Sequence, residues 1–152
     1  MLMSMLLAAA VSGPPITVCV VAADKDAAGF VVPGAADLQA TAQDLTKRLG
    51  KQAKKGLLVA TDGCQATARV IYRGTLDGAP VVTAHYGYGL TNKATPKTPI
   101  VRVELVVGEH VVPFEGRGLP DNPFAAFGRA ASNVSDSITE WIVANREVIL
   151  KK

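Results

Sequence analysis

The pattern of apolar and polar residues divides the first half of the chain into strand-like and helix-like segments. Residues 16–23 form a continuous apolar run rich in β-branched side chains, which is typical of a buried central strand. Residues 37–55 repeat apolar side chains at helical spacing, and Gly56 is placed to end that helix. Its apolar face consists of Leu38, Ala42, Leu45 and Leu49. Residues 57–60 are again apolar, so this part of the chain predicts a β-α-β arrangement.

A β-hairpin is predicted to follow. Residues 66–76 alternate between apolar and polar side chains, and Asp77-Gly78 comes next, where a two-residue type I′ turn is favoured. Residues 80–90 then return as the partner strand. Residues 91–99 are polar and contain Lys and Pro, which predicts a loop.

A second hairpin and a helix complete the predicted fold. Residues 100–107 and 110–115 pair across a turn at Gly108-Glu109. Asp121-Asn122-Pro123 starts the last helix, because proline is favoured at the first helical position. Its apolar stripe consists of Phe124, Phe127, Ala131, Val134, Ile138, Trp141 and Ile142. We therefore predict an α+β fold, β-α-β followed by two β-hairpins and a C-terminal helix, with two helices packed on one face of a mainly antiparallel sheet.

The first thirteen residues differ from the rest because they are uncharged and almost entirely apolar. Their apolar run of about 11 residues is shorter than the roughly 20 that span a bilayer. Small residues and then Pro14-Pro15 follow, as at the cleavage site of an export signal, although no Lys or Arg precedes Lys25. We interpret residues 1–13 as a signal-like segment and residues 16–150 as a single domain, periplasmic or secreted and not transmembrane. The alternative is a buried N-terminal helix or a tail.

Composition narrows the class of protein further. A chain of 152 residues, 49% of them apolar, is long enough to form one core without a metal. Its net charge of +3 is too small to argue for nucleic acid as a partner. The two cysteines, Cys19 and Cys64, are bridged in an oxidising compartment or reduced in the cytosol. With no second pair to complete a zinc site, we expect no metal and no cofactor.

The most unusual local composition is a segment in which tyrosines alternate with glycines. In a strand, His85 shares one face with Gly87 and Gly89, while Tyr86 and Tyr88 lie on the other. Glycines inside strands often mark a bulge or the close approach of another backbone. The segment is therefore either a shallow binding surface or a bulged edge strand with packed tyrosines. We expect an edge or bulge there that contacts a protein partner, a second copy of the chain included.

Two arginines offer a further candidate contact. Arg69 and Arg73 fall on one face of the strand predicted for residues 66–76, two pleats apart. Together they can hold a carboxylate or a phosphate. The plainer interpretation is a set of paired surface charges.

A basic cluster marks the end of the first helix. It consists of Lys47, Arg48, Lys51, Lys54 and Lys55. These positions cover an arc of about 120° opposite the leucine face. A solvated helix face is the simplest interpretation, and a polyanion-binding module is the alternative.

Catalytic motifs are weak throughout the sequence. His85 and His110 lack ligand spacings such as HExxH, and no G-x-S-x-G occurs. A small hydrolase or transferase that uses Cys64 or a histidine is the competing hypothesis. The balance favours a non-enzymatic protein.

Residues 30–75 carry a resemblance to known proteins. The order of helix, short strand, polar turn and strand is set by Asp37-Leu38, Asp44-Leu45, Leu57-Leu58-Val59 and residues 66–73. It resembles small exported bacterial proteins of unknown function and is similar to periplasmic α/β modules of envelope assembly lipoproteins. The chain departs from the latter because Ile16-Thr17-Val18 before Cys19 is not a lipid-attachment box. The resemblance implies localisation to the envelope and no chemistry, so we predict an exported protein that binds a protein or cell-envelope partner.

Export predicts a shortened mature chain. We expect cleavage between Ala10 and Pro15, because small residues precede the Pro-Pro pair there. Mass spectrometry of the protein recovered from the cell envelope or medium gives the mature N-terminus. An intact Met1 in that material would contradict cleavage, and a purely cytosolic product would contradict export.

Overall fold

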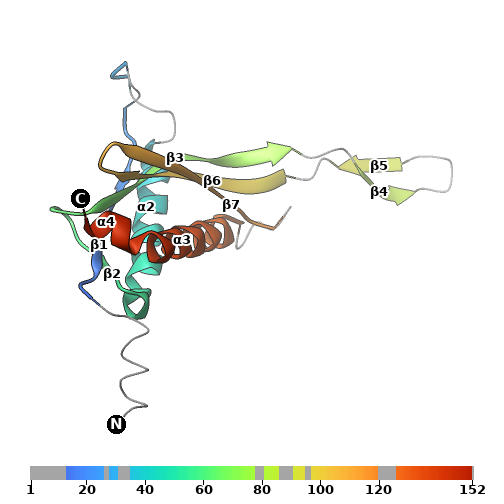
Figure 1. Cartoon of the computed structure of the whole chain (residues 1–152). Coiled ribbons are helices and arrows are strands. Elements are labelled where there is room, and N and C mark those ends of the chain that lie inside the picture. Colours follow the sequence, from blue (N-terminus) through green and yellow to red (C-terminus); the bar gives the residue numbers. More distant parts are fainter. Residues whose placement is uncertain are drawn as a thin grey trace, which may run out of the picture.

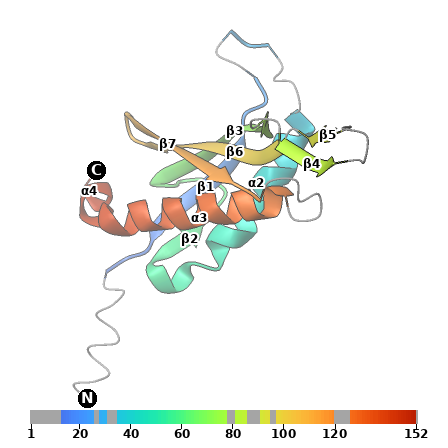
Figure 2. The same ribbon diagram turned by 90° about the vertical axis from the view of Figure 1, so that its right-hand side faces the viewer.

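The computed structural model of the chain describes residues 13–25, 28–30, 35–77, 81–85, 91–94, 97–119 and 126–151, and it has two layers (Figures 1 and 2). The main sheet has the strand order β2-β1-β3-β6-β7, with β1 (Ile16–Ala22), β2 (Leu57–Val59), β3 (Ala66–Asp77), β6 (Lys97–Val107) and β7 (His110–Arg117). The helical elements are α2 (Ala35–Gly50), η1 (Ala53–Lys55), α3 (Ala126–Ala144) and α4 (Arg146–Leu150). Both long helices cover the same face of the sheet. The predicted α+β class and helix placement are confirmed, and the sheet is mixed.

The parallel part of the sheet contains a short connection in which the chain crosses β1. Strand β1 pairs in parallel with β2 on one side and with β3 on the other. Strand β2 ends and β3 begins opposite the same residue, Val18. The residues between them therefore only have to cross β1, whereas a parallel crossover usually needs a dozen residues or more. Backbone N–H groups of Ala60 and Gln65 donate to the carbonyls of Val18 and Thr17, both at 3.0 Å, and fix the step on either side.

Helix α2 follows the sequence pattern closely. All four residues of its predicted apolar face are buried, and they join the sheet-facing core with Ile16 and Val18. The regular helix ends at Gly50, and the 3-10 turn η1 continues to Lys55. Gly56 then adopts the left-handed conformation with a φ of 87°, which glycine reaches without steric cost. The predicted stop is thus in place, after a tighter last turn.

Helix α3 has two buried stripes. Ala130, Val134, Ile138 and Ile142 belong to the core that faces the sheet. A neighbouring stripe of small side chains, Ala131, Ser135 and Thr139, is also buried, and it allows α3 to lie close against α2. Phe127 and Trp141 are partly buried against the core, and the predicted residue Phe124 lies outside the described part of the chain.

Helix α3 also passes very close to the edge strand β7 at Gly116. A Cβ atom on Gly116 would overlap the carbonyl oxygen of Ala130 and lie 2.6 Å from Cγ2 of Val134. Because neither the helix backbone nor a buried valine can move cheaply, this position requires glycine.

The middle of the chain differs from the predicted pair of hairpins. Strand β3 pairs with β6, from Thr67↔Val106 to Asp77↔Lys97, and not with residues 80–90. The segments β4 (Val81–His85) and β5 (Thr91–Ala94) pair with each other in a separate two-stranded sheet. The expected loop over residues 91–99 is therefore strand β5 and the start of β6. The hairpin of β6 and β7, turning at Gly108-Glu109, is confirmed.

Replacing Gly116 by alanine should destabilise the fold strongly. We expect a loss of about 3 kcal/mol in the free energy of unfolding, because the added methyl group overlaps the α3 backbone. Urea unfolding followed by circular dichroism measures the loss. Gly50→Ala is the matched control, since no atom lies within 4 Å of its Cβ position. It should be neutral or stabilise α2 by less than about 1 kcal/mol. Equal effects of the two substitutions would contradict the close approach.

Candidate functional site

The most prominent candidate surface is the two-stranded sheet of β4 and β5, which we call the projecting ribbon. It lies beyond the paired ends of β3 and β6, away from the two-layer body (Figure 1). Its register runs from Val81↔Ala94 to His85↔Thr91, with a shift between Val82 and Ala84. His85 thus ends β4. Tyr86 and Tyr88, the other candidate contact residues of this segment, lie outside the described part of the chain.

The two outer edges of the main sheet are poor sites for strand addition. Strand β2, at one edge, is three residues long. At the other edge, the N–H of Gly118 donates to the carbonyl of Pro99 on β6. With the register of the two strands, this bond shows which residues of β7 direct their backbone groups inward to β6 and which direct them outward to solvent. By that alternation Pro113 occupies an outward position, where it has no N–H to offer. Short strands and proline are common ways of protecting an edge.

A side chain of α3 also protects the outer edge of β7 at the end of that strand. The side-chain amide of Asn133, on α3, donates to the carbonyl of Arg117 at 2.7 Å. In contrast, none of the strands that the structure describes pairs with the outer edge of β4 or of β5. Strand addition by a partner is therefore least hindered at the projecting ribbon.

The sheet face opposite the helices carries a network of surface charges. The Arg69 guanidinium pairs with Glu104 at 2.7 Å, and Glu115 pairs with both Arg102 and Arg117 at 3.4 and 3.6 Å. Exposed pairs of this kind contribute little to stability. The Arg102 guanidinium also lies 5.0 Å from the centre of the Tyr72 ring. Because these charges are paired with one another, we expect this face of the sheet to be exposed to solvent.

Arg69 and Arg73 do not share a face, contrary to the expectation from a regular strand. Val70 pairs with Val103 and Tyr72 pairs with the next residue of β6, Arg102, so Ile71 is the extra residue of a β-bulge. A bulge shifts every later side chain to the opposite face. Arg69 therefore joins the charged face, while Arg73 points to the helix side.

On the helix side, Arg73 lies between α2 and α3. Its guanidinium is 4.1 Å from the centre of the Phe127 ring and 3.4 Å from Oγ1 of Thr41. A cation over an aromatic face is attracted by the ring quadrupole, which suits a structural role between the helices. Arg69 and Arg73 are thus too differently placed to hold one anion together.

The basic cluster at the end of α2 is divided between paired and unpaired side chains. The Arg48 guanidinium forms an ion pair with Asp44 at 3.1 Å and is partly buried. The four lysines, Lys47, Lys51, Lys54 and Lys55, are exposed. The positive charge that faces solvent is therefore that of the lysines alone.

The hypothesis that Cys64 is a nucleophile is wrong. Cys64 is joined to Cys19 in a disulfide, with 5.7 Å between their Cα atoms, so it has no thiol to ionise. The histidines do not meet either. His85 lies beyond the Lys97 end of β6 and His110 follows the Val107 end, about 30 Å away along the strand. Acid–base catalysis by this pair is therefore excluded on geometry.

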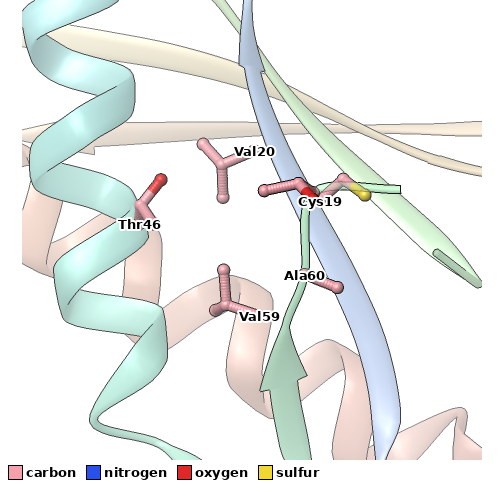
Figure 3. A pocket seen from close by; sticks show the side chains of 6 residues that line it. Cys19, Val20, Thr46, Val59 and Ala60 are labelled. Atoms are coloured by element: carbon pink, nitrogen blue, oxygen red, sulfur yellow. The ribbon is translucent and has the colours of Figure 1, made fainter. Parts of the chain in front are cut away.

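Two pockets are small and mostly apolar. One, of about 240 Å³, lies between α2 and the β2 edge, where Val20, Thr46 and Val59 face one another (Figure 3). The Thr46 hydroxyl is already used, because it donates to the carbonyl of Ala42 at 2.7 Å. The other, of about 300 Å³, is lined by residues that include His110, Trp141 and Val148, at the turn of β6 and β7. Neither brings together a nucleophile and a base.

The described residues form neither a cluster of metal ligands nor a helix that could span a membrane. Within the described ranges, no three His, Cys, Asp or Glu side chains come together as a metal site would require. None of the helices in the same ranges is long and apolar enough to span a bilayer.

Comparison with known proteins gives structural neighbours alone. No family model and no curated protein matches the sequence. Among solved structures, rare lipoprotein B from Shewanella oneidensis overlaps with 12% identity and a TM-score of 0.41, over 89% of this chain and 91% of that one. A minor lipoprotein from Acinetobacter baumannii is 12% identical with a TM-score of 0.45, over 86% of this chain and 94% of that one. A PelC dodecamer from Paraburkholderia phytofirmans is 13% identical with a TM-score of 0.43, over 85% of this chain and 91% of that one. The similarity to lipoproteins expected from the sequence is found in the first two of these structures, at 12% identity each.

Sequence reasoning missed the ribbon and the bulge. Residues 91–94, Thr-Asn-Lys-Ala, are too polar to be distinguished from a loop. The apolar run Val70-Ile71-Tyr72 interrupts the alternation of the strand, but such a run does not distinguish a bulge from a strand that is buried on both faces. The strand predicted over residues 80–90 includes β4, but its partner is β5 and not β3.

Removing the disulfide should cost a substantial part of the domain's stability. The bond joins residues 45 positions apart, so its chain-entropy contribution is about 4 kcal/mol. We expect the double variant Cys19→Ala, Cys64→Ala to unfold at correspondingly lower urea concentration. The wild-type protein should lose the same stability on reduction, and the double variant should be insensitive to reductant. A variant as stable as the oxidised protein would contradict the anchoring role of the bond.

Proposed function

We propose that this chain is an exported, non-enzymatic protein of the cell envelope that binds a protein partner through the projecting ribbon. The unit that we expect to act is a single domain of residues 16–150. The observation that carries the proposal is the position of β4 and β5 outside the two-layer body, in a sheet of their own.

An isolated two-stranded ribbon is marginally stable in water, because it has few neighbours to bury its side chains against. A partner strand on either edge would supply hydrogen bonds to the backbone groups of Val81–His85 or Thr91–Ala94. The protected edges at β2 and β7 favour the ribbon over the main sheet as the place for this addition. The same reasoning applies whether the partner is another envelope protein or a second copy of the chain.

Export is supported by the cysteine pair. The Cys19–Cys64 disulfide lies on the step over β1, where it holds the crossing residues to that strand. Disulfides persist in oxidising compartments and are rare in the cytosol. The fold therefore relies on chemistry that the periplasm or the cell exterior provides.

Site-specific photo-crosslinking in cells tests the proposal. A photoreactive amino acid at Thr83, in the middle of β4, should give an adduct whose mass spectrum identifies the partner. The same amino acid at Val143, exposed on α3, is the matched control and should give none. Adducts from Val143 and not from Thr83 would move the contact surface to the helices and contradict the proposal.

A shortened variant separates binding from folding. Asp77 and Lys97 are paired in register, so an Asn-Gly turn can replace residues 78–96 and close β3 on β6 directly. We expect the free energy of unfolding to change by less than about 1 kcal/mol, since β4 and β5 form a sheet of their own outside the two-layer body. The partner identified at Thr83 should no longer be recovered with this variant. Undiminished recovery would contradict binding through the ribbon.

A further inference from the structure

The pocket at the turn of β6 and β7, which we call the turn pocket, has a buried apolar floor and an exposed apolar rim. Its volume is about 300 Å³. Val107 and Ile149 belong to the core and form the floor. Val111 and Val148 also line the pocket but are 51% and 56% exposed. A ligand seated between them would therefore cover apolar surface that otherwise contacts water.

A break in the C-terminal helix brings one wall of the turn pocket into place. Helix α3 ends at Ala144, and Asn145 departs from helical geometry with a φ of −110° and a ψ of 16° before α4 begins. Figure 2 shows α4 set at an angle to α3. With this change of direction, Val148 and Ile149 of α4 line the same pocket as the residues of the β6–β7 turn.

Helix α4 is held in place without a ligand. Its Ile149 side chain is 2% exposed within the core. At its start, the Arg146 guanidinium donates to the carbonyl of Gly56 at 3.5 Å and to the carbonyl of Pro14. The wall of the pocket is thus formed in advance, and binding does not have to order it.

The polar groups of the turn pocket are few, and one of them is an open acceptor. The Asn145 side-chain amide donates through Nδ2 to the carbonyl of Trp141 at 2.8 Å, which leaves Oδ1 as an acceptor. This side chain does not cap α4, and no group on a described residue donates to its Oδ1 atom. Trp141 itself, partly buried against the core, adds an aromatic surface to the lining.

The lining also limits the charge of a ligand. His110 is exposed at the pocket, but none of its lining residues is Asp, Glu, Lys or Arg. An ionised ligand would lose hydration there without gaining a permanent countercharge, so a neutral ligand is favoured. The pocket has about twice the volume of a cavity that holds benzene, which leaves room for one substituted ring or two fused rings.

We propose that the turn pocket binds a free, neutral, small aromatic molecule that carries a hydroxyl or N–H donor, of which phenol is the simplest example. The ring packs against the indole of Trp141, since aromatic pairs are favoured beyond the area that they bury. The donor meets the open acceptor of Asn145, and the valines enclose the remaining edge of the ring. This inference does not rest on the projecting ribbon, which follows the opposite end of β6.

Nitrogen–proton correlation NMR of the full chain measures this binding. Trp141 is the only tryptophan of the sequence, so its indole N–H gives a single resonance that reports on the pocket. Phenol should shift this resonance with a dissociation constant of about 1 mM, an ordinary affinity for so small a ligand. Anisole keeps the ring without the donor, and cyclohexanol keeps the donor without the aromatic ring. Each should bind about fivefold more weakly than phenol.

A pair of matched variants tests the location. Val148→Glu should weaken the binding of phenol and of anisole about tenfold, because the ligand would have to dehydrate a carboxylate at the rim. Anisole cannot donate to that carboxylate, so its loss reports on the rim alone. Val143→Glu is the control, because Val143 is 48% exposed on α3 and does not line the pocket. It should leave both affinities unchanged, and circular dichroism verifies that both variants fold.

A second pair tests the acceptor. Asn145→Asp and Asn145→Leu both remove the amide donor to Trp141, but only the aspartate variant keeps a side-chain acceptor. We expect the fivefold preference for phenol over anisole to persist in Asn145→Asp and to vanish in Asn145→Leu. A preference of the same size in both variants would contradict the assigned contact.

Several other results would overturn the proposal. These are an unchanged Trp141 resonance at phenol concentrations about ten times the expected constant, equal binding of the three probes, and equal losses in the two valine variants. A photoreactive amino acid at Val148 that gives a protein adduct in cells would assign the pocket to a partner's side chain and would equally overturn it. Because these readouts do not involve β4 or β5, their failure leaves the proposed function of the ribbon standing, and the reverse also holds.

Discussion

The structure depends on one constraint, the placement of β1 inside the sheet with a parallel partner strand on each side. Ile16 and Val18 are fully buried there against the helices. Because β2 ends where β3 begins, the chain has to step across β1, and the step lies on the face that carries Cys19. The disulfide to Cys64 fixes that step. The helices take the opposite face, which leaves them free to pack continuously over the sheet.

This arrangement gives the molecule two different ends. Helix α2 runs back alongside β1, so its basic carboxyl end lies where the apolar N-terminal residues join the domain. Strands β3 and β6 extend the other way, past the end of β7, and lead to the projecting ribbon. The start of β1 and the projecting ribbon therefore lie at opposite ends of the molecule, and a single topological choice sets both positions.

The edges of the main sheet show how such a molecule avoids indiscriminate pairing. Strand β2 is short, and Pro113 and the bond from Asn133 to Arg117 reduce the hydrogen-bonding groups that β7 presents. The charged face opposite the helices is internally paired, and this lowers its attraction for other surfaces. In the described part of the chain, no further strand pairs with the outer edges of β4 and β5.

The sequence by itself determined the local elements. Helical periodicity placed Leu38 and Leu49 in the core, Gly56 at the helix stop, and the hairpin of β6 and β7 about its turn, since these features depend on residues close together in the chain. The partner of β3, the bulge at Ile71 and the ribbon were decided by tertiary structure. Alternation of apolar and polar residues indicates the two faces of a strand, but it identifies neither the neighbouring strand nor the position of a β-bulge. The candidate contact at His85 was found by composition, whereas the separation of Arg69 from Arg73 and the hydrogen bond from Ile16 to Gly56 came from packing between distant segments.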